Sequence, residues 1–243
     1  MFLSTELDRL RVVLVAARNP LNIGAVARAM SNFGFSRLRV VNPFEVAFRE
    51  ARSAVGASSV LAGAEQFKTV AEAVADCTLV IGTTAADDRK LQHPLRQLNE
   101  GARLIRRRLK STPVAILFGS EKRGLSNQDF SYCHWLMRIP TRPDHSSMNL
   151  GQAVAVCLYE LTRTGKALKA DKAKLPTAAE IDRITGLLIE ALHLSGFVRR
   201  GTDVPTEEKV RRLVRRLNIP ARDTEMWLSM LRQILWRLRS QRP

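Results

Sequence analysis

Short apolar runs alternate with amphipathic stretches along the first 163 residues of the chain. The apolar runs at residues 11–16, 37–41, 78–81, 114–118 and 135–139 have the length and composition of buried strands. Other stretches repeat apolar positions at the spacing of helices, at residues 23–33, 47–55, 69–75, 94–110 and 149–163. Strands that alternate with helices indicate βαβ units, so we predict an α/β fold with a mostly parallel sheet.

The C-terminal third has a different pattern. Residues 164–176 are polar, rich in lysine and without periodicity, which is typical of a linker. We therefore divide the chain into an α/β domain (1–163), a linker (164–176) and a small all-α extension (177–243). In the extension, helices are expected at residues 178–194, 206–217 and 224–238. The apolar stripes predicted to pack together consist of Ile181, Ile184, Leu188, Leu192, Val210, Leu213, Val214, Leu217, Trp227, Met230 or Leu231, Ile234 and Leu238.

The chain is strongly basic, with 39 basic and 23 acidic residues and a net charge of +16. Residues 1–163 carry a net charge of +8, and residues 164–243 carry the same net charge in half the length. This balance favours a polyanionic partner such as nucleic acid. A basic helix face is often only solvated, but this charge density favours RNA contact by an exposed face made of Arg211, Arg212, Arg215 and Arg216, together with Arg199 and Arg200.

Several classes of protein are disfavoured by features that the sequence lacks. No apolar run approaches the roughly 20 residues that span a bilayer, and no signal-peptide core is present, so we expect a cytoplasmic protein without a membrane partner. The three cysteines, Cys77, Cys133 and Cys157, are odd in number and widely spaced, which argues against a disulfide framework. Without CxxC or HxxxH, no metal is expected. The dinucleotide, P-loop, GxSxG and HExxH signatures are also absent.

Two glycine-bearing segments, about a hundred residues apart, each follow an expected strand. The first is NPLNIGAVAR at residues 19–28, and the second is FGSEKRGL at residues 118–125. A third segment that follows a strand, Gly82-Thr83-Thr84-Ala85, has the same position. Because ligands bind beyond the carboxyl ends of strands in open parallel sheets, we expect these segments to form one composite pocket with Ile139 and residues 146–151.

The first segment has features of an anion site. If a helix begins near Ile23, Asn22 is its N-cap and Gly24 lies in its first turn, where free amides favour an anion. Arg28 follows just over one turn later, and its guanidinium can bind a phosphate through two hydrogen bonds. The alternative is a capped helix with a surface arginine. In the other segments, Glu121 and Asn149 can hydrogen-bond either a ligand or a neighbouring loop.

Three segments of the chain carry a resemblance to a known family, namely NPLNIGAVARAMSNFG from Asn19, LFGSEKRGLSN from Leu117 and IPTRPDHSSMNLGQAVAV from Ile139. In this order they resemble the three motifs of the SPOUT class of RNA methyltransferases, and most closely its TrmH-type ribose 2′-O-methyltransferases. Segments at residues 196–198, 209–213 and 230–235 look like the C-terminal helical extension of the TrmJ branch. The resemblance covers essentially the whole chain.

The resemblance implies an enzyme that transfers a methyl group from S-adenosylmethionine to the ribose 2′-hydroxyl of cytidine or uridine at position 32, in the anticodon loop of tRNA. It also implies a sheet that ends in a deep trefoil knot, and a homodimer whose active sites are completed near the dimer interface. By motif position, the cofactor would contact Thr83, Thr84, Ala85, Gly119, Ile139, Ser146, Ser147 and Met148. Arg28 corresponds to the essential arginine of the first motif, with Asn22, Glu121 and Asn149 as supporting polar residues.

The chemistry of a guanidinium limits the role of Arg28. Because this group stays protonated at ordinary pH, Arg28 is better suited to clamp a phosphate and stabilise a developing alkoxide than to act as a base. The proton would then leave through that phosphate, through water or through Ser147. His145 is an alternative base, because the pKa of a histidine can lie near neutrality.

Other functions stay open at the level of sequence. One alternative is a substrate at another tRNA position or in ribosomal RNA, although ribosomal RNA enzymes of this family usually carry an N-terminal RNA-binding extension. A second alternative is a non-catalytic RNA-binding protein. A nucleotide-dependent enzyme of the ordinary doubly wound type is the third alternative, and no fingerprint supports it.

Overall fold

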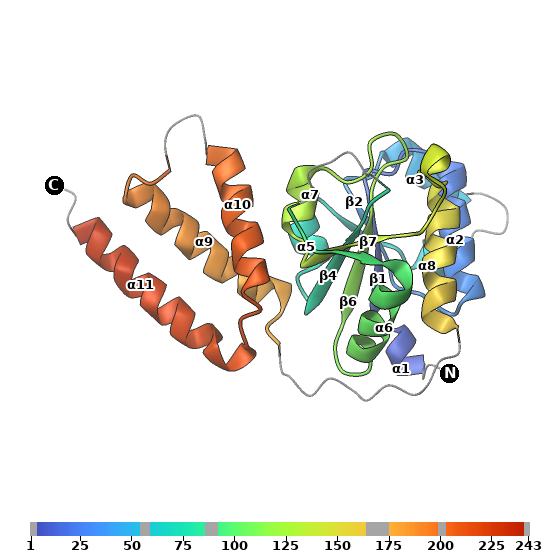
Figure 1. The fold of residues 1–243 in the computed structure, drawn as a ribbon. Coiled ribbons are helices and arrows are strands. Elements are labelled where there is room, and N and C mark those ends of the chain that lie inside the picture. Colours follow the sequence, from blue (N-terminus) through green and yellow to red (C-terminus); the bar gives the residue numbers. More distant parts are fainter. Residues whose placement is uncertain (1–3, 54–58, 86–91, 164–174, 199–202, 241–243) are drawn as a thin grey trace.

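Figure 1 shows the computed structural model of the chain, which describes residues 4–53, 59–85, 92–163, 175–198 and 203–240. A sheet with the strand order β3-β2-β1-β6-β4-β7-β5 lies at its centre, and every pairing of neighbouring strands is parallel. The predicted α/β fold with a mostly parallel sheet is thereby confirmed. The strands are β1 (Leu10–Val15), β2 (Leu38–Val41), β3 (Glu65–Phe67), β4 (Leu79–Thr83), β5 (Leu95–Gln97), β6 (Val114–Phe118) and β7 (Trp135–Arg138).

Helices cover both faces of the sheet and form the C-terminal extension (Figure 1). Around the sheet lie α1 (Ser4–Leu7), α2 (Pro20–Asn32), α3 (Glu45–Ser53), α4 (Ser59–Ala62), α5 (Val70–Ala73), α6 (Leu98–Leu109), α7 (Asn127–Ser131), the 3-10 helix η1 (Pro143–His145) and α8 (Leu150–Thr162). The extension consists of α9 (Ala178–Leu194), α10 (Asp203–Arg216), the 3-10 helix η2 (Ala221–Asp223) and α11 (Thr224–Ser240).

The strands divide the core into two layers. Along β1, Val12 and Leu14 face the layer that holds α2, α6 and α8, whereas Val13 faces the layer that holds α5 and α7. This alternation follows from the two-residue period of a strand. Since both faces are covered, the central strands are mostly apolar, as expected for a parallel sheet.

The predicted helix at residues 94–110 is wrong in its first part. Residues Leu95–Gln97 form the edge strand β5, and α6 begins only at Leu98. Leu95 and Gln97 are exposed, so this short strand lacks the buried apolar run that marks the others. The sequence patterns also missed β3, α4 and α7, which are three to five residues long and too short to show a period.

In the extension, α9 packs against both α10 and α11 (Figure 1). Ile184, Val214 and Leu231 meet in the core of these helices. The predicted stripes were partly wrong, because no helix among the described residues covers the outer faces of α10 and α11. The predicted core residues that are 48–50% exposed are Leu213, Leu217 and Ile234, while Leu228 and Leu235 are buried instead. Of the alternatives Met230 and Leu231, Leu231 is the buried one.

The extension is joined to the sheet domain at its first residues. The predicted linker lies outside the described residues except for Leu175 and Pro176. Directly after it, the amide of Ala178 donates to the Cys77 carbonyl at 2.7 Å, and Ala178 is buried in the same core cluster as Val74. The first turn of α9 therefore completes the core on the α5 side of the sheet.

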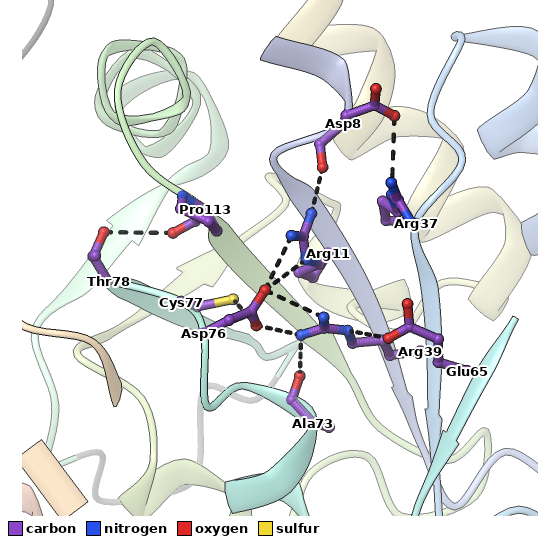
Figure 2. Close-up of polar contacts among 10 residues, drawn as sticks. All are labelled: Asp8, Arg11, Arg37, Arg39, Glu65, Ala73, Asp76, Cys77, Thr78 and Pro113. Atoms are coloured by element: carbon purple, nitrogen blue, oxygen red, sulfur yellow. Dashed lines mark hydrogen bonds and ion pairs between the residues drawn. The ribbon is translucent and has the colours of Figure 1, made fainter. Parts of the chain in front are cut away.

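An ionic network ties the amino ends of the strands together (Figure 2). Asp76, just before β4, accepts hydrogen bonds from Arg11 of β1 at 3.0 and 3.1 Å and from Arg39 of β2 at 3.2 Å. Arg39 also donates to Glu65 of β3 at 3.0 Å and to the carbonyl of Ala73 at 2.8 Å. Burial favours the protonated form of Asp76, but the hydrogen bonds and charges of Arg39 and Arg11 outweigh it and lower the pKa of Asp76.

We predict that Asp76→Asn destabilises the fold by about 2 kcal/mol, because it leaves the largely buried Arg39 facing a neutral amide. The folded-state pKa of Asp76 is depressed, so its contribution is present above the unfolded value near pH ~3.9 and is lost as the pH falls through the folded value. Urea unfolding at pH 7 and at a series of pH values below 4 measures both effects.

The control is Asp8→Asn, because Asp8 pairs with Arg37 at 4.0 Å and both side chains are about half exposed. Exposed pairs contribute little, so we expect a change within about 0.5 kcal/mol. Equal losses of unfolding free energy in the Asp76→Asn and Asp8→Asn variants would show that Asp76 has no special role at the amino ends of the strands.

Candidate active site

A cavity of about 280 Å³ lies at the carboxyl ends of β4, β6 and β7. Loops from three distant parts of the chain line it, which agrees with the place where open parallel sheets bind ligands. All eight residues that the resemblance assigns to the cofactor line this one cavity: Thr83, Thr84, Ala85, Gly119, Ile139, Ser146, Ser147 and Met148. The composite pocket expected from the sequence is thus present in part, because no residue of the first glycine-bearing segment (19–28) is among those that line it.

A tight turn after β6 forms one wall of the cavity. A Cβ atom on Gly119 would lie 2.0 Å from the carbonyl carbon of Gly124, so no side chain fits at this position. Gly124 has a φ of +67° and donates its amide to the Ser120 carbonyl at 2.8 Å. Glycine is required at Gly119 by close approach and is favoured at Gly124 by its left-handed backbone.

The other two walls are held by bonds between neighbouring loops and strands. The Thr83 hydroxyl donates to the Leu117 carbonyl at 2.8 Å, and the Thr84 amide donates to the Met137 carbonyl at 3.0 Å. In the third segment, the Thr141 hydroxyl donates to the Ser146 carbonyl at 3.2 Å. The cavity is therefore built largely from fixed backbone, with apolar contact from side chains such as Ile139.

The helix beside the cavity begins earlier than predicted. Asn19, rather than Asn22, is the N-cap of α2, and its side chain accepts the Leu21 amide at 2.9 Å. Pro20 occupies the first helical position, where its missing amide hydrogen costs nothing. An asparagine followed by proline is a recognised helix start, so this cap could have been found from the sequence.

Glu121 joins the second segment to the start of α2. Its carboxylate accepts the backbone amides of Arg18 and Asn19 at 3.2 Å each and the side-chain amide of Asn22 at 3.1 Å. Burial would raise the pKa of Glu121, but these bonds and its own backbone amide lower it overall. The anion beside these amides is therefore a carboxylate of the chain itself.

Asn149 extends this connection to the third segment. Its Nδ2 group donates to the Asn22 side-chain oxygen at 2.8 Å, while its own Oδ1 atom accepts the Gly151 amide at 2.9 Å and caps α8. A Cβ atom on Gly151 would lie 2.6 Å from the Ala25 side chain, so α2 and α8 pack closely here. The bridge formed by Glu121, Asn22 and Asn149 fixes α2 relative to the cavity.

Arg28 does not line the cavity of its own chain. It is exposed on α2, and it lies two turns after the exposed Leu21 on the same side of the helix. Ser147 is exposed and lines the cavity, whereas His145 is exposed at the end of η1 and is not among the lining residues. Within one chain, the structure assembles the cofactor residues and the polar bridge but keeps Arg28 apart from the cavity.

The exposed basic face predicted on α10 is wrong for two of its four arginines. Arg212 is buried beside Glu208 at 3.6 Å, and Arg215 is buried against Asp182 at 2.8 Å. The reason is that α10 is covered on one side by α9 and on another by α7. Arg211 lies over the ring of Tyr132, 4.7 Å from its centroid, and of the four arginines only Arg216 is exposed. Arg199 and Arg200 lie outside the described residues.

Among the described residues, no helix is long and apolar enough to cross a membrane. The same part of the chain contains no group of three or more histidine, cysteine, aspartate or glutamate residues that could hold a metal ion.

Comparisons with known proteins agree with the motifs and the fold. The SpoU rRNA Methylase family matches residues 9–159 of the chain. The chain is 34% identical to tRNA (cytidine/uridine-2′-O-)-methyltransferase TrmJ of Escherichia coli (strain K12), and the match covers 97% of each chain. The crystal structure of TrmJ from Z. mobilis ZM4 superposes with a TM-score of 0.80 at 31% identity, over 92% of this chain and 98% of that one. A putative methylase family protein from Neisseria gonorrhoeae gives a TM-score of 0.66 at 29% identity, over 76% of this chain and 97% of that one.

The family match and the cavity concern the same part of the chain. The matched residues include both glycine-bearing segments and the loops that line the cavity. On this evidence, the chain belongs to the SpoU methylase family.

Proposed function

We propose that the protein is a tRNA methyltransferase that transfers a methyl group from S-adenosylmethionine to the ribose 2′-hydroxyl of cytidine or uridine. The observation that carries this proposal is the convergence of the second and third motif segments, together with Thr83, Thr84 and Ala85, on one cavity. Similarity to TrmJ over nearly the whole chain, extension included, favours tRNA over ribosomal RNA. At the finer level, the proposed target is position 32 of the anticodon loop, as the resemblance to the TrmJ branch implies. A cytoplasmic location follows from this substrate.

The residues of the cavity fit the proposed cofactor. Gly119 lets the backbone of the turn close tightly, which leaves its amide and carbonyl groups to face a flat base. Ile139 and Met148 provide apolar contact, and the walls carry no metal-binding group among the described residues. S-adenosylmethionine would supply an activated methyl on a positively charged sulfur. The chain then has to hold the two reactants in line and dispose of one proton.

Arg28 is the proposed clamp for the substrate. Its guanidinium stays charged, so it would bind the phosphate beside the target ribose and stabilise the oxygen as its proton leaves. Ser147 lines the cavity and is the proposed route for that proton, directly or through water. A positioning role is proposed for Glu121, Asn22 and Asn149, because their hydrogen bonds orient the helix that carries Arg28.

We propose a homodimer that brings Arg28 to a cavity, since Arg28 does not line the cavity of its own chain. The face of α2 that carries Arg28 also carries Leu21, which is 80% exposed. A Cβ atom on Gly24 would meet nothing within 4 Å, so this glycine is not needed for packing within the chain. A bare backbone beside an exposed leucine suits the close approach of a second copy.

The trefoil knot and the domain boundaries remain proposals that the topology supports. Strand β7 lies between β4 and β5, although β5 and β6 both precede it in the chain. A strand inserted between two earlier ones is compatible with a threaded chain. For the extension, the proposed contacts with RNA are Arg199, Arg200, Arg211 and Arg216. We keep the division into residues 1–163 and 177–243, joined at 164–176.

The first test is the mapping of methyl groups on tRNA. We expect mass spectrometry to find a 2′-O-methyl mark at cytidine or uridine 32 after incubation with the protein and S-adenosylmethionine. A tRNA with a 2′-deoxy nucleotide at that position is the control, because it lacks the accepting hydroxyl and should stay unmodified. A mark at another position would overturn the assignment of position 32, and no mark on any tRNA would overturn the proposed function.

We predict that Arg28→Lys lowers kcat/KM for methyl transfer by at least about 100-fold, because a lysine cannot make the two parallel hydrogen bonds of a guanidinium. Binding of S-adenosylmethionine, measured by calorimetry, should be unchanged because Arg28 does not line the cavity. The matched control is Arg103→Lys, at an exposed arginine of α6. Near wild-type methyl transfer by Arg28→Lys would contradict the proposed role of Arg28 as a phosphate clamp.

We predict that Leu21→Glu converts a dimer into a monomer of 27.2 kDa, because it places a charge in the proposed apolar interface. Light scattering after gel filtration measures the mass. Leu217→Glu is the control, since Leu217 is also exposed but lies in the extension, directly after α10. A Leu21→Glu variant that remains dimeric would place the interface elsewhere.

A further inference from the structure

A second cavity, of about 400 Å³, lies between the sheet domain and the extension. Its walls come from the first residues of β4 and β7, from β5, from the second half of α6 and from the end of α10. The lining residues are Leu79, Pro94, Arg96, Leu104, Arg107, Arg108, His134, Trp135, Arg215, Arg216 and Asn218. Five of them are arginines and none is a carboxylate, so we call this cavity the arginine cleft.

Two of these arginines hold buried hydrogen-bond donors without a partner among the described residues. The side chain of Arg215 is completely buried, and its Nη2 group donates to Asp182 at 2.8 Å, but its Nε and Nη1 groups are unpaired. The Nε group of Arg96 is also buried and unpaired, and its guanidinium lies over the Trp135 ring, 5.7 Å from the centroid. Each buried unpaired donor costs about 1–3 kcal/mol, which an acceptor in the cleft would recover.

The remaining groups around the cleft provide little negative charge. The Nδ1 atom of His134 accepts the Val80 amide at 3.1 Å, so a neutral ring carries its hydrogen on Nε2 and is a donor there. Burial, followed by the charge of Arg215, lowers the pKa of His134 to about 3. Asp182 is the carboxylate that pairs with Arg215, and burial raises its pKa despite that pairing. The cleft is therefore rich in donors and positive charge.

We propose that the arginine cleft binds a phosphate group of the tRNA backbone. A phosphate would bring negative charge to a cleft whose lining contains no carboxylate, and its oxygens accept the paired hydrogen bonds that a guanidinium offers. The proposal rests on the proposed tRNA substrate. The proposal also gives α10 a different role in RNA binding from the one predicted from the sequence. Arg215 and Arg216 would bind RNA together with Arg96 of the sheet domain, and not as part of a separate basic face.

The position of the cleft suits a long substrate. The cleft opens at the amino ends of β4 and β7, whereas the cofactor cavity lies at their carboxyl ends. A strand of five residues spans about 16 Å, so the two sites are separated by at least the height of the sheet. A phosphate held in the cleft would therefore belong to a part of the tRNA outside the cofactor cavity.

The test is the double variant Arg96→Gln/Arg216→Gln, with tRNA affinity measured by fluorescence anisotropy over a range of salt concentrations. We expect roughly three- to tenfold weaker binding and a slope of log K against log salt that falls by about 1, the value for one lost phosphate contact. Arg216→Gln alone, at an exposed residue that does not endanger folding, should show part of the same change.

The control variant Arg103→Gln/Arg232→Gln removes the same charge from exposed sites outside the cleft. Unchanged affinity and slope in this control support the cleft. An equal loss in both double variants would mean a general charge effect and would overturn the proposal. Unchanged affinity and slope in the folded cleft variants would also overturn it.

Calorimetry with inorganic pyrophosphate separates RNA from a free phosphate compound. If pyrophosphate binding depends on Arg96 and Arg216 while tRNA affinity does not, the cleft serves a free phosphate and the RNA assignment is wrong. Failure of the proposed function has a different signature. Wild-type protein would leave tRNA unmethylated, yet its tRNA affinity would still depend on the two cleft arginines.

Discussion

The backbone amides at the start of α2 need an acceptor, and Glu121 supplies it from about a hundred residues away. The same carboxylate binds Asn22, which in turn accepts a hydrogen bond from Asn149 at the start of α8. Two helix starts and the turn after β6 are thus positioned by a single connected set of polar groups. Because the turn also forms a wall of the cofactor cavity, the shape of the cavity and the direction of α2 cannot change independently.

The two ends of the sheet are stabilised in different ways. At the carboxyl ends, amides, hydroxyls and the carboxylate of Glu121 fix the loops and leave backbone groups available for a ligand. At the amino ends, Arg11, Arg39 and Asp76 join the strands through charged groups (Figure 2). The carboxylate of Glu121 lines the cavity that is proposed to hold a positively charged sulfur, and its charge is opposite to that of the sulfur. The arginine cleft lies at the amino ends as well, where positive charge does not oppose that sulfur.

The sequence predicted the elements with a clear period and the residues carried by a motif. The strand at 114–118 and the helix at 178–194 have the predicted bounds, and the eight residues that the resemblance assigns to the cofactor meet in one cavity. It did not predict what depends on distant partners. Periodicity shows that α10 has a polar side, but it does not show the partners of Arg215 and Arg211. These are Asp182 of α9 and Tyr132, directly after α7. The edge strand β5 was missed because its exposed residues resemble the start of α6.

The hydrogen bond from Ala178 to Cys77 has a consequence for the order in which the molecule can be completed during synthesis. The two residues are about a hundred positions apart, and Ala178 belongs to the core cluster that includes Val74 and Leu136. That side of the sheet therefore keeps apolar surface open to solvent until the ribosome has made the first turn of α9. Because domains generally fold as units during synthesis, the sheet domain of this chain has to wait for part of its extension before its second layer closes.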